Sequence, residues 1–356
     1  MKNAGSHFLL SELPNWAPFP AVLRGKVRLE GSRATNPVAV GDRVRYEAAD
    51  GTPSEGRATR VCHPDNRRFP GTPDRTKAGG PSWGDGGVSP EGELPRRELP
   101  PAAPAVITEV LDRNNYVIRR STNLSRESHV IAANIDRAFI IVTLYFPEIK
   151  LQFLDRILVM CGVFGVPVSI VLNKVDLYRE EAAEQVRAFH DIYEGAGYEV
   201  IDTSARTGEG IDTLRRRVKE SGVCLFSGES GVGKSSLIKA LDPSLDPKVG
   251  QISDAHLQGK HTTSLYEMYP LRAGDPYGFI IDSPGIRGFG LVHLEKDEIA
   301  RYFPEMLNAS ENCRFVPCTH THEPDCAVKQ AVDEGRISAE RYASYLGMLE
   351  EEKKFR

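Results

Sequence analysis

Apolar and polar residues alternate in the N-terminal third of the chain. Between residues 21 and 61, short runs with apolar residues at every second position are separated by Gly, Asn and Asp. This pattern predicts short antiparallel strands, as in a meander or a small barrel. The same alternation returns at residues 105–121. We therefore expect a small β-barrel that closes across the intervening residues.

Those intervening residues, 63–104, are dense in Pro and Gly and have almost no apolar periodicity. A segment of this composition cannot bury enough apolar surface to offset the entropy lost when it is ordered. We interpret it as a long insertion in the barrel, and the sequence assigns it no role.

From residue 135 the pattern changes to apolar runs of strand length that alternate with helical periodicity. Such an alternation predicts a parallel α/β sheet. After about residue 294 the pattern is helical to the C-terminus. The expected strands are 136–144, 166–176, 198–205 and 223–228, and the expected helices are 151–165, 179–197 and 210–220.

The length of 356 residues corresponds to two or three domains at about 150 residues each. The patterns divide the chain into a tail, a barrel domain that contains the insertion, an α/β domain and a helical domain. The expected bounds are 1–19 for the tail, 20–134 for the barrel domain, 135–294 for the α/β domain and 295–356 for the helical domain.

Composition excludes several classes of protein. Apolar residues make up 40% of the chain and charged residues 26%, which rules out a mostly disordered or fibrous protein. The longest apolar runs have the length of strands, so no membrane-spanning helix and no membrane partner are expected. The N-terminus lacks the apolar core of a secretory signal. The six cysteines do not form a disulfide framework, which fits a reducing, cytoplasmic location.

The net charge of −4 argues weakly against a nucleic-acid partner, but its distribution along the chain changes that argument. Residues 1–137 carry 20 Lys and Arg against 16 Asp and Glu, and the rest of the chain carries 25 against 33. Arginine supplies 17 of those 20 cations, and its planar guanidinium suits phosphate recognition. The barrel half is therefore compatible with an RNA partner, and equally with an arginine-rich solvated surface.

The residues after the expected strand 223–228 match the phosphate-binding pattern GxxxxGK[ST] and open a helical pattern. Glycines let backbone N–H groups surround the phosphates, Lys234 reaches the β- and γ-phosphates and Ser235 binds Mg²⁺. Because Lys234 reaches the reacting phosphates, we assign it to catalysis in addition to nucleotide binding. The residues expected to hold the nucleotide here are Gly228, Glu229, Ser230, Gly231, Val232, Gly233, Lys234, Ser235 and Ser236.

The motif Asp-Ser-Pro-Gly at residues 282–285 directly follows another strand-like run. Asp282, at the end of that run, can hold Mg²⁺ through water, and the backbone N–H of Gly285 can meet a γ-phosphate. Because the motif follows the phosphate-binding pattern along the chain, both are expected in one site.

Two further motifs lie at the ends of predicted strands that precede the phosphate-binding pattern along the chain. Asn173, Lys174 and Asp176 form an NKxD motif, and Ser204 and Ala205 belong to a Thr-Ser-Ala motif. A carboxylate at Asp176 accepts hydrogen bonds from N1–H and the 2-amino group of guanine, a donor pair that adenine lacks. The Thr-Ser-Ala motif would place a backbone N–H near the guanine carbonyl. Four motifs, each at a strand end, predict a GTPase that binds GTP or GDP with Mg²⁺.

The order of these motifs is unusual, because the base-reading motifs precede the phosphate-binding motifs. In this the sequence resembles the circularly permuted GTPases. Such a site can survive permutation, since a ligand contacts positions in space and the termini of a domain often lie close enough to be joined.

A compact cysteine and histidine cluster follows, with the spacing C-x4-C-x-H-x5-C at Cys313, Cys318, His320 and Cys326. Three thiolates and one imidazole suit a closed, tetrahedral Zn²⁺ site. His322 lies at nearly the same spacing, so the choice between the two histidines stays open.

The small barrel, the four motifs in this order and the Cys3His cluster together resemble the ribosome small-subunit-dependent GTPase A family (RsgA/YjeQ). The resemblance covers roughly residue 20 to the C-terminus. It implies an OB-fold barrel, a circularly permuted P-loop GTPase domain and a helical zinc domain. It also implies a role in late maturation of the small (30S) ribosomal subunit, whose rRNA the protein binds and which stimulates GTP hydrolysis. No DNA partner is expected, and no motif indicates a stable oligomer, so we expect a monomer.

The Gly-[Arg/Lys]-His-Thr-Thr segment of that family matches residues 259–263. By this resemblance Thr262 or Thr263 is the switch threonine, and we assign both to the nucleotide and Thr263 also to Mg²⁺ and to catalysis. Ile286 stands where many GTPases have a glutamine, and an aliphatic side chain cannot orient water. His261 is the nearest catalytic substitute, although it could equally order the switch loop.

Ile286 also keeps a second hypothesis open. In that hypothesis the protein is an RNA-binding checkpoint, in which bound GTP or GDP only sets the affinity for the subunit and hydrolysis is incidental.

Overall fold

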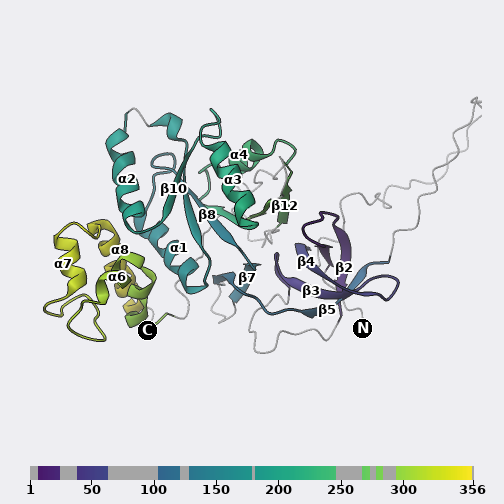
Figure 1. Ribbon diagram of the computed structural model, residues 1–356, viewed down its shortest axis with the longest axis horizontal. Coiled ribbons are helices and arrows are strands. Elements are labelled where there is room, and N and C mark those ends of the chain that lie inside the picture. The colour runs from purple at the N-terminus through teal and green to yellow at the C-terminus, as the bar shows by residue number, and fades with distance from the viewer. Residues whose placement is uncertain are drawn as a thin grey trace, which may run out of the picture.

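The computed structural model describes residues 7–24, 38–62, 103–120, 128–178, 181–245, 267–272, 278–283 and 294–354. Figure 1 shows a small barrel of N-terminal strands, an α/β sheet in the middle and a group of helices at the C-terminal end. The predicted insertion lies outside the described residues, apart from residues 103 and 104.

The barrel has five strands, and its apolar side chains face inward. The strands are β1 (His7–Ser11), β2 (Phe19–Leu23), β3 (Arg43–Glu47), β4 (Pro53–Cys62) and β5 (Ala105–Val110). They pair in the order β1-β2-β5-β3-β4, and β1 also pairs with β4, which closes the sheet on itself. Alternate residues such as Val44, Tyr46 and Ile107 form one buried cluster. The predicted OB-type barrel is confirmed, with β5 joining it after the insertion.

The expectation that residues 1–19 form a tail outside the barrel is wrong. Strand β1 lies within them and closes the barrel against β2 and β4. Phe8 and Leu10 are fully buried in the barrel core. A run with only two inward-facing apolar positions is too short for its periodicity to stand out from the surrounding sequence.

The alternating residues near 116–121 were expected to belong to the barrel, but they form part of a separate sheet. Strands β6 (Tyr116–Arg120) and β7 (Ser128–Ala133) pair in a two-stranded sheet of their own, outside the barrel. A period of two identifies a strand but not its partner, because distant segments decide which strands pair.

The α/β sheet confirms the predicted parallel arrangement. Its strands are β8 (Arg137–Val142), β9 (Val168–Asn173), β10 (Glu199–Thr203), β11 (Val223–Gly228), β12 (Glu267–Leu271) and β13 (Gly278–Asp282). They lie in the order β12-β13-β11-β8-β9-β10. All neighbours are parallel except β12, which runs antiparallel to β13. β12 also meets β4 of the barrel at the pair Glu267–Arg60.

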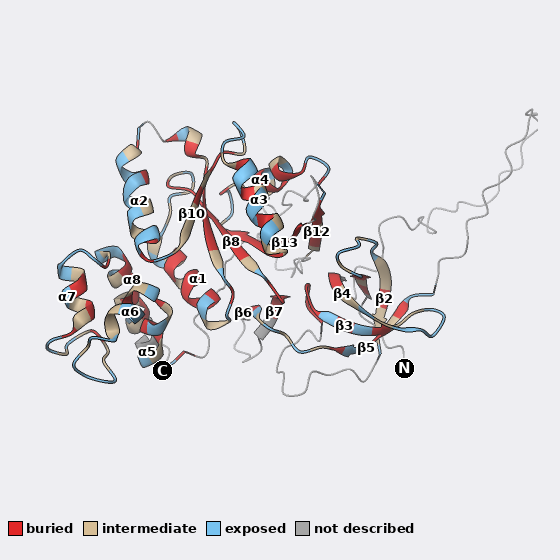
Figure 2. Cartoon of the chain, viewed as in Figure 1, coloured by how far each residue is buried: buried red, intermediate tan, exposed pale blue. Residues whose placement is uncertain are grey.

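Helices cover both faces of this sheet (Figure 1). They are α1 (Leu151–Val163), α2 (Ala183–Gly195), α3 (Ile211–Ser221) and α4 (Lys234–Leu241). Ile140 of β8 packs in one cluster with α1 and α2, and its neighbour Ile141 packs in a second cluster with α3 and α4. The strands are therefore buried on both sides, as the red colour in Figure 2 shows. This explains why they appear in the sequence as continuous apolar runs.

The topology brings the four motifs to one edge of the sheet. Strands β9, β10, β11 and β13 are parallel, so their carboxyl ends lie at the same edge. The described residues of the motifs follow these ends directly, at residues 173–176, 203–205, 228–236 and 282–283. The site is thus assembled by the sheet, whatever the order of the motifs along the chain.

The described residues after Leu294 form a helical unit, which we call the C-terminal module (residues 294–354). Its helices are α5 (Lys296–Ile299), η4 (Ala300–Tyr302), α6 (Pro304–Ser310), α7 (Ala327–Asp333) and α8 (Ala339–Lys354). Its core includes Phe303 and Met348 and extends to Val159 of α1. Arg341 of α8 hydrogen-bonds Asp155 of α1, so the module is docked on the α/β domain. Within the described part of the chain, no helix is long and apolar enough to cross a membrane.

Candidate nucleotide site and metal centre

The loop between β11 and α4 requires glycine at several positions. A Cβ atom on Gly228 would lie 2.3 Å from the carbonyl oxygen of Ile141. Gly231 and Gly233 have φ angles of +88° and +96°, in the left-handed region that side chains disfavour. The backbone can therefore curl around an anion, and α4 begins at Lys234 with its first N–H groups free of helical partners.

Lys234 lies across this loop. Its ammonium donates to the carbonyl oxygens of Gly228 and Glu229, at 2.7 and 3.0 Å. Burial lowers the pKa of Lys234, and the nearby charges of Asp282 and Glu229 oppose that shift. Two backbone carbonyls thus hold the Lys234 ammonium inside the loop, where its charge can attract phosphate oxygens.

Asp282 ends β13 opposite this lysine. Its Oδ1 atom is buried and has no hydrogen-bond partner among the described residues. Burial raises the pKa of Asp282, and the charge of Lys234 opposes that shift. A buried carboxylate oxygen with no partner needs a donor or a cation, and the hydrated Mg²⁺ that the motif pattern predicts beside Ser235 would meet this requirement.

The NKxD motif contacts the phosphate-binding loop. The Asn173 side chain donates to the Val232 carbonyl at 2.8 Å and accepts from the Thr203 hydroxyl at 3.1 Å. The Lys174 ammonium donates to the carbonyl oxygens of Phe146 and Gly231, both at 2.6 Å. These two residues therefore brace the loop at 228–236, a structural task that the motif pattern did not indicate.

Asp176 carries the acceptor expected for the base. Its side chain is 9% exposed, and Oδ1 accepts from the Ser204 hydroxyl at 2.5 Å. Oδ2 accepts from Nε of Arg206 at 2.7 Å, and Nη2 of the same guanidinium lies 2.6 Å from Oδ2 in an ion pair. The hydrogen bond from Ser204, together with Arg206, lowers the pKa of Asp176 in spite of partial burial. The carboxylate is thus ionised and oriented, and Ala205 follows Ser204 at the same strand end. Sequence reasoning missed Arg206, which belongs to no motif pattern.

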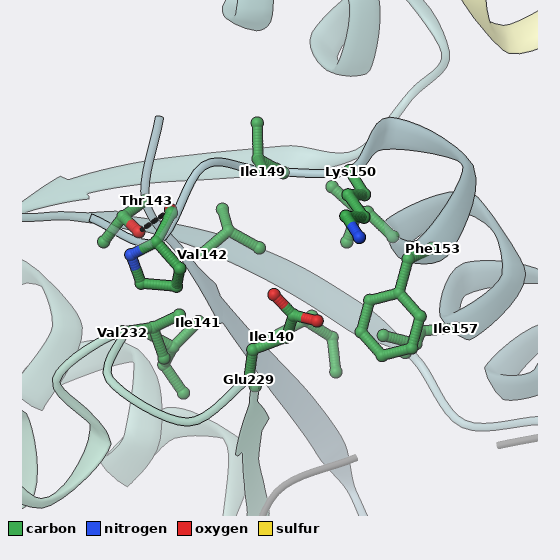
Figure 3. Close-up of a pocket in the computed structure, with 13 residues that line it drawn as sticks. Ile140, Ile141, Val142, Thr143, Ile149, Lys150, Phe153, Ile157, Glu229 and Val232 are labelled. Carbon is green, nitrogen blue, oxygen red and sulfur yellow. Dashed lines mark hydrogen bonds between the residues drawn. The ribbon is translucent and has the colours of Figure 1, made fainter. Parts of the chain in front are cut away.

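A largely apolar hollow lies beside the phosphate-binding loop (Figure 3). Residues of β8 and α1 line it, among them Val142, Phe153 and Ile157, together with Val232 of the loop. Glu229 and Lys150 are the charged residues of its lining. Helix α1 therefore contacts both this hollow and the C-terminal module, and no sequence pattern indicated the hollow.

The four residues of the cysteine and histidine cluster converge. Their ligand atoms all lie within 4.8 Å of one another, with Sγ–Sγ distances of 3.8 and 3.9 Å from Cys326 to Cys318 and Cys313. Nδ1 of His320 lies 3.7 Å from Sγ of Cys313 and 3.4 Å from that of Cys326. Tetrahedral zinc with Zn–S of about 2.3 Å requires S–S edges of about 3.8 Å and S–N edges of about 3.6 Å. The cluster therefore fits a zinc site.

His320 and not His322 completes this cluster. Nδ1 of His322 lies 2.9 Å from the Thr321 hydroxyl, and its side chain is exposed. The backbone around His320 is held by Tyr342 and Tyr345 of α8, whose hydroxyls donate to the carbonyls of His320 and Thr319 at 2.6 and 2.7 Å. The geometry thus resolves the choice that the spacing left open.

Four of the predicted site residues, His261, Thr262, Thr263 and Gly285, lie outside the described residues. Ile286 does so as well. Their assignments remain predictions.

A parallel sheet with the base-reading motifs before the phosphate-binding motifs defines a circularly permuted P-loop GTPase. A sequence profile described as "RsgA GTPase" matches residues 110–292. A protein of Bacteroides fragilis strain YCH46, named "Small ribosomal subunit biogenesis GTPase RsgA", is 41% identical over 100% of this chain and 97% of its own length. A protein of the same name from Phocaeicola vulgatus is 38% identical over the same shares. The chain belongs to the RsgA GTPase family and is an enzyme that hydrolyses GTP.

Solved structures agree with this assignment. The crystal structure of YjeQ from Thermotoga maritima matches with a TM-score of 0.64 and 27% identity, over 98% of each chain. The structure titled "The crystal structure of YloQ, a circularly permuted GTPase" has a TM-score of 0.60 over 100% of this chain and 94% of its own. At 21% identity that second likeness concerns the fold alone.

Proposed function

We propose that this chain hydrolyses GTP during biogenesis of the small ribosomal subunit. The observation that carries the proposal is the combination, in one chain, of a base-reading and phosphate-binding edge with a flanking barrel and a Cys3His cluster. Relatives matched over nearly their full length carry the name "Small ribosomal subunit biogenesis GTPase RsgA". The checkpoint hypothesis, in which hydrolysis is incidental, is not favoured by these matches.

In this proposal the residues divide into three tasks. Lys234 and the backbone of the loop at 228–236 hold the phosphates. Ser235, Thr263 and Asp282 hold Mg²⁺, which neutralises phosphate charge when bound. Asp176, with the Thr-Ser-Ala backbone, selects guanine, while Gly285, Thr262 and His261 act at the γ-phosphate.

We propose the small subunit and its rRNA as partners of the barrel and the C-terminal module. Small OB-type barrels commonly bind irregular or single-stranded RNA. In the described part of the barrel, Arg24 pairs with Glu47, and Arg45 pairs with Glu55 and Glu109. Support for RNA binding therefore comes from the fold and the relatives more than from these cations. A cytoplasmic, monomeric protein is part of the same proposal.

Purified small subunits should raise GTP turnover by about tenfold or more, because the completed complex orders groups around the γ-phosphate. The measurement is phosphate release with the protein alone and with small subunits, large subunits and whole ribosomes. Equal turnover with and without small subunits would contradict the proposal. Normal release from the subunit by a variant that cannot hydrolyse GTP would instead support the checkpoint hypothesis.

Replacing Asp176 with asparagine should weaken GTP binding by about 10- to 100-fold, the effect of losing hydrogen bonds to a charged acceptor. Binding of XTP should improve at the same time, because an amide can donate to the 2-oxo group of xanthine. Equilibrium binding of both nucleotides checks this. Asp212→Asn, at an exposed position on α3, is the matched control. An unchanged preference for GTP over XTP would refute the role of Asp176.

We also propose that the Cys3His cluster binds one Zn²⁺ per chain. Cys318→Ser should lose the metal and speed hydrogen exchange over residues 313–326, because metal binding contributes folding energy to such loops. Native mass spectrometry and exchange measurements check this. Cys161→Ala, at a buried position outside the cluster, should keep its zinc. A wild-type protein that binds no zinc, or equal zinc in Cys318→Ser, would contradict the assignment.

A further inference from the structure

A short turn follows β8, and we call its residues 143–147 the β8 turn. Thr143 and Pro147 line the apolar hollow together with Glu229 and Val232 of the phosphate-binding loop. The Thr143 side chain is buried, and its hydroxyl donates to the Pro147 carbonyl at 2.8 Å, the dashed line at Thr143 in Figure 3. This hydrogen bond spans the turn and fixes the path of its backbone.

The β8 turn holds Phe146 in a backbone conformation that a bulky residue disfavours. Its φ angle is +61°, in the left-handed region. The Phe146 carbonyl accepts from the Lys174 ammonium at 2.6 Å. Such a conformation persists only where surrounding contacts hold it, and the hydrogen bonds to the carbonyls of Phe146 and Pro147 lie directly at this point.

Lys174 joins the β8 turn to the phosphate-binding loop. Its ammonium also donates to the Gly231 carbonyl at 2.6 Å, so two of its three donors are committed to backbone carbonyls. A Cβ atom on Gly231 would lie 3.7 Å from Cδ of Pro147, which places the proline ring beside the same glycine. A shift of the turn would therefore reach Gly231 by two routes.

The same turn also supports the residue before Lys174. The Tyr145 ring packs edge-on against Tyr178, with ring centres 5.9 Å apart. The Tyr178 hydroxyl donates to the Asn173 carbonyl at 2.5 Å. Both residues that brace the loop at 228–236 are thus held from the β8 turn.

We propose that Thr143 is a positioning residue for nucleotide binding, which acts through the backbone of Phe146 on Lys174 and the loop at 228–236. The inference rests on the proposed nucleotide site. The Thr143 hydroxyl donates to Pro147, so its effect on the nucleotide passes through the turn. Thr143 belongs to none of the four motifs.

The inference has a measurable consequence. Thr143→Val keeps the shape of the side chain, loses the donor and should bind GDP about three- to tenfold more weakly, the effect of one hydrogen bond. The GDP dissociation rate should rise by the same factor, because changes within one interface act mainly on dissociation. Thr143→Ser restores the hydroxyl and should recover most of the affinity.

Hydrolysis at saturating GTP should respond differently from binding. Its single-turnover rate in Thr143→Val should stay within about twofold of the wild type, because an interaction lost equally from the ground and transition states raises KM and leaves kcat unchanged. A rate that falls as much as the affinity would overturn the positioning role.

The binding experiment uses a fluorescent GDP analogue, with equilibrium titration and stopped-flow displacement on the full chain. Thr59→Val is the matched control, because that threonine is also buried and donates to the Leu9 carbonyl, at 3.2 Å, within the barrel. It should not change GDP affinity. Unchanged affinity in Thr143→Val, or a loss that Thr143→Ser shares in full, would overturn the inference.

A double-mutant cycle tests the route through Lys174. Lys174→Met keeps the apolar stem and removes the ammonium. In that background Thr143→Val should weaken GDP binding by less than about twofold more, because residues in one hydrogen-bond network are not additive. Equal losses in both backgrounds would show that Thr143 acts by another route.

Asp176→Asn in the same assay separates this inference from the proposed function. If Asp176→Asn and Lys174→Met both keep the wild-type GDP affinity, the nucleotide site is wrong and the inference fails with it. If both variants lose affinity and Thr143→Val does not, only the inference is wrong.

Discussion

Replacing Arg341 with methionine should destabilise the docked C-terminal module by about 3–5 kcal/mol, the usual result of removing one partner from a buried ion pair. The Arg341 side chain is 1% exposed and donates to Asp155 at 2.7 Å and to both oxygens of Glu305 at 2.8 and 3.0 Å. Burial raises the pKa of Asp155 against the attraction of Arg341. Without the guanidinium, two carboxylates would stay in a poorly solvated site with no counter-charge.

Aromatic rings add to this effect. The guanidinium carbon lies 4.7 Å from the ring centre of Phe303 and 5.4 Å from that of Tyr198. Cation–π contacts at buried sites contribute about 2 kcal/mol or more, and methionine retains only the apolar part of the packing. The loss of stability in Arg341→Met should therefore affect both the C-terminal module, which contains Phe303, and the adjoining α/β domain, which contains Tyr198.

The measurement is native-state hydrogen exchange of α1, α6 and α8, because a single unfolding free energy is poorly defined for a chain of several domains. Arg336→Met is the matched control, since that arginine is exposed and pairs only with Glu334 in the described residues. Arg336→Met should lower the stability of the C-terminal module by less than about 1 kcal/mol. Adding Asp155→Leu and Glu305→Leu to Arg341→Met should restore much of the loss. Wild-type exchange in Arg341→Met would refute the prediction.

The second large effect is catalytic. Lys234→Ala should lower GTP turnover by about 100- to 1,000-fold, the range found when one preorganised donor to a developing negative charge is removed. In the structure the ammonium already lies within the loop, held by the carbonyls of Gly228 and Glu229. Little reorganisation is then needed when phosphate binds, so most of the loss should fall on the chemical step and on triphosphate binding.

Single-turnover hydrolysis with saturating GTP, with and without small subunits, measures this effect. Lys239→Ala is the control, because that lysine is exposed in the last turn of the same helix. Circular dichroism and GDP binding show whether the variant remains folded. Turnover within about threefold of the wild type in Lys234→Ala would contradict the assignment, since even an exposed ion pair has effects of that size.

Local sequence was enough for the parallel strands of the α/β domain, whereas the antiparallel strand β12 was not among the predicted strands. The strands of its sheet are buried on both faces, so they appear as apolar runs. The loop at 228–236 carries glycines at the positions where the backbone takes left-handed angles or passes close to β8. The left-handed angles at Gly231 and Gly233 are requirements of the loop itself, so the chemistry could be predicted from the motif, whereas the close approach of Gly228 to β8 is a contact between distant segments.

Contacts between distant segments could not be predicted in this way. The pairing of Asn173 with Val232 and of Asp176 with Arg206 depends on how the sheet aligns its strand ends. Strand β1 has only two inward-facing residues, and its role becomes visible once β2 and β4 lie beside it. The choice of His320 over His322 was open for the same reason, because neighbouring residues in a loop can face opposite ways.

The class of chemistry and the order of the modules could be predicted from the amino-acid sequence, because glycines, carboxylates and cysteines at set spacings impose local requirements that few other structures meet. The partners of those groups, in contrast, depend on the folded arrangement of the chain. Hydrogen bonds and ion pairs depend on distances between atoms far apart in the chain, such as Arg341 and Asp155 at 2.7 Å. Burial then sets their strength, because the same pair in water would be solvated and weak.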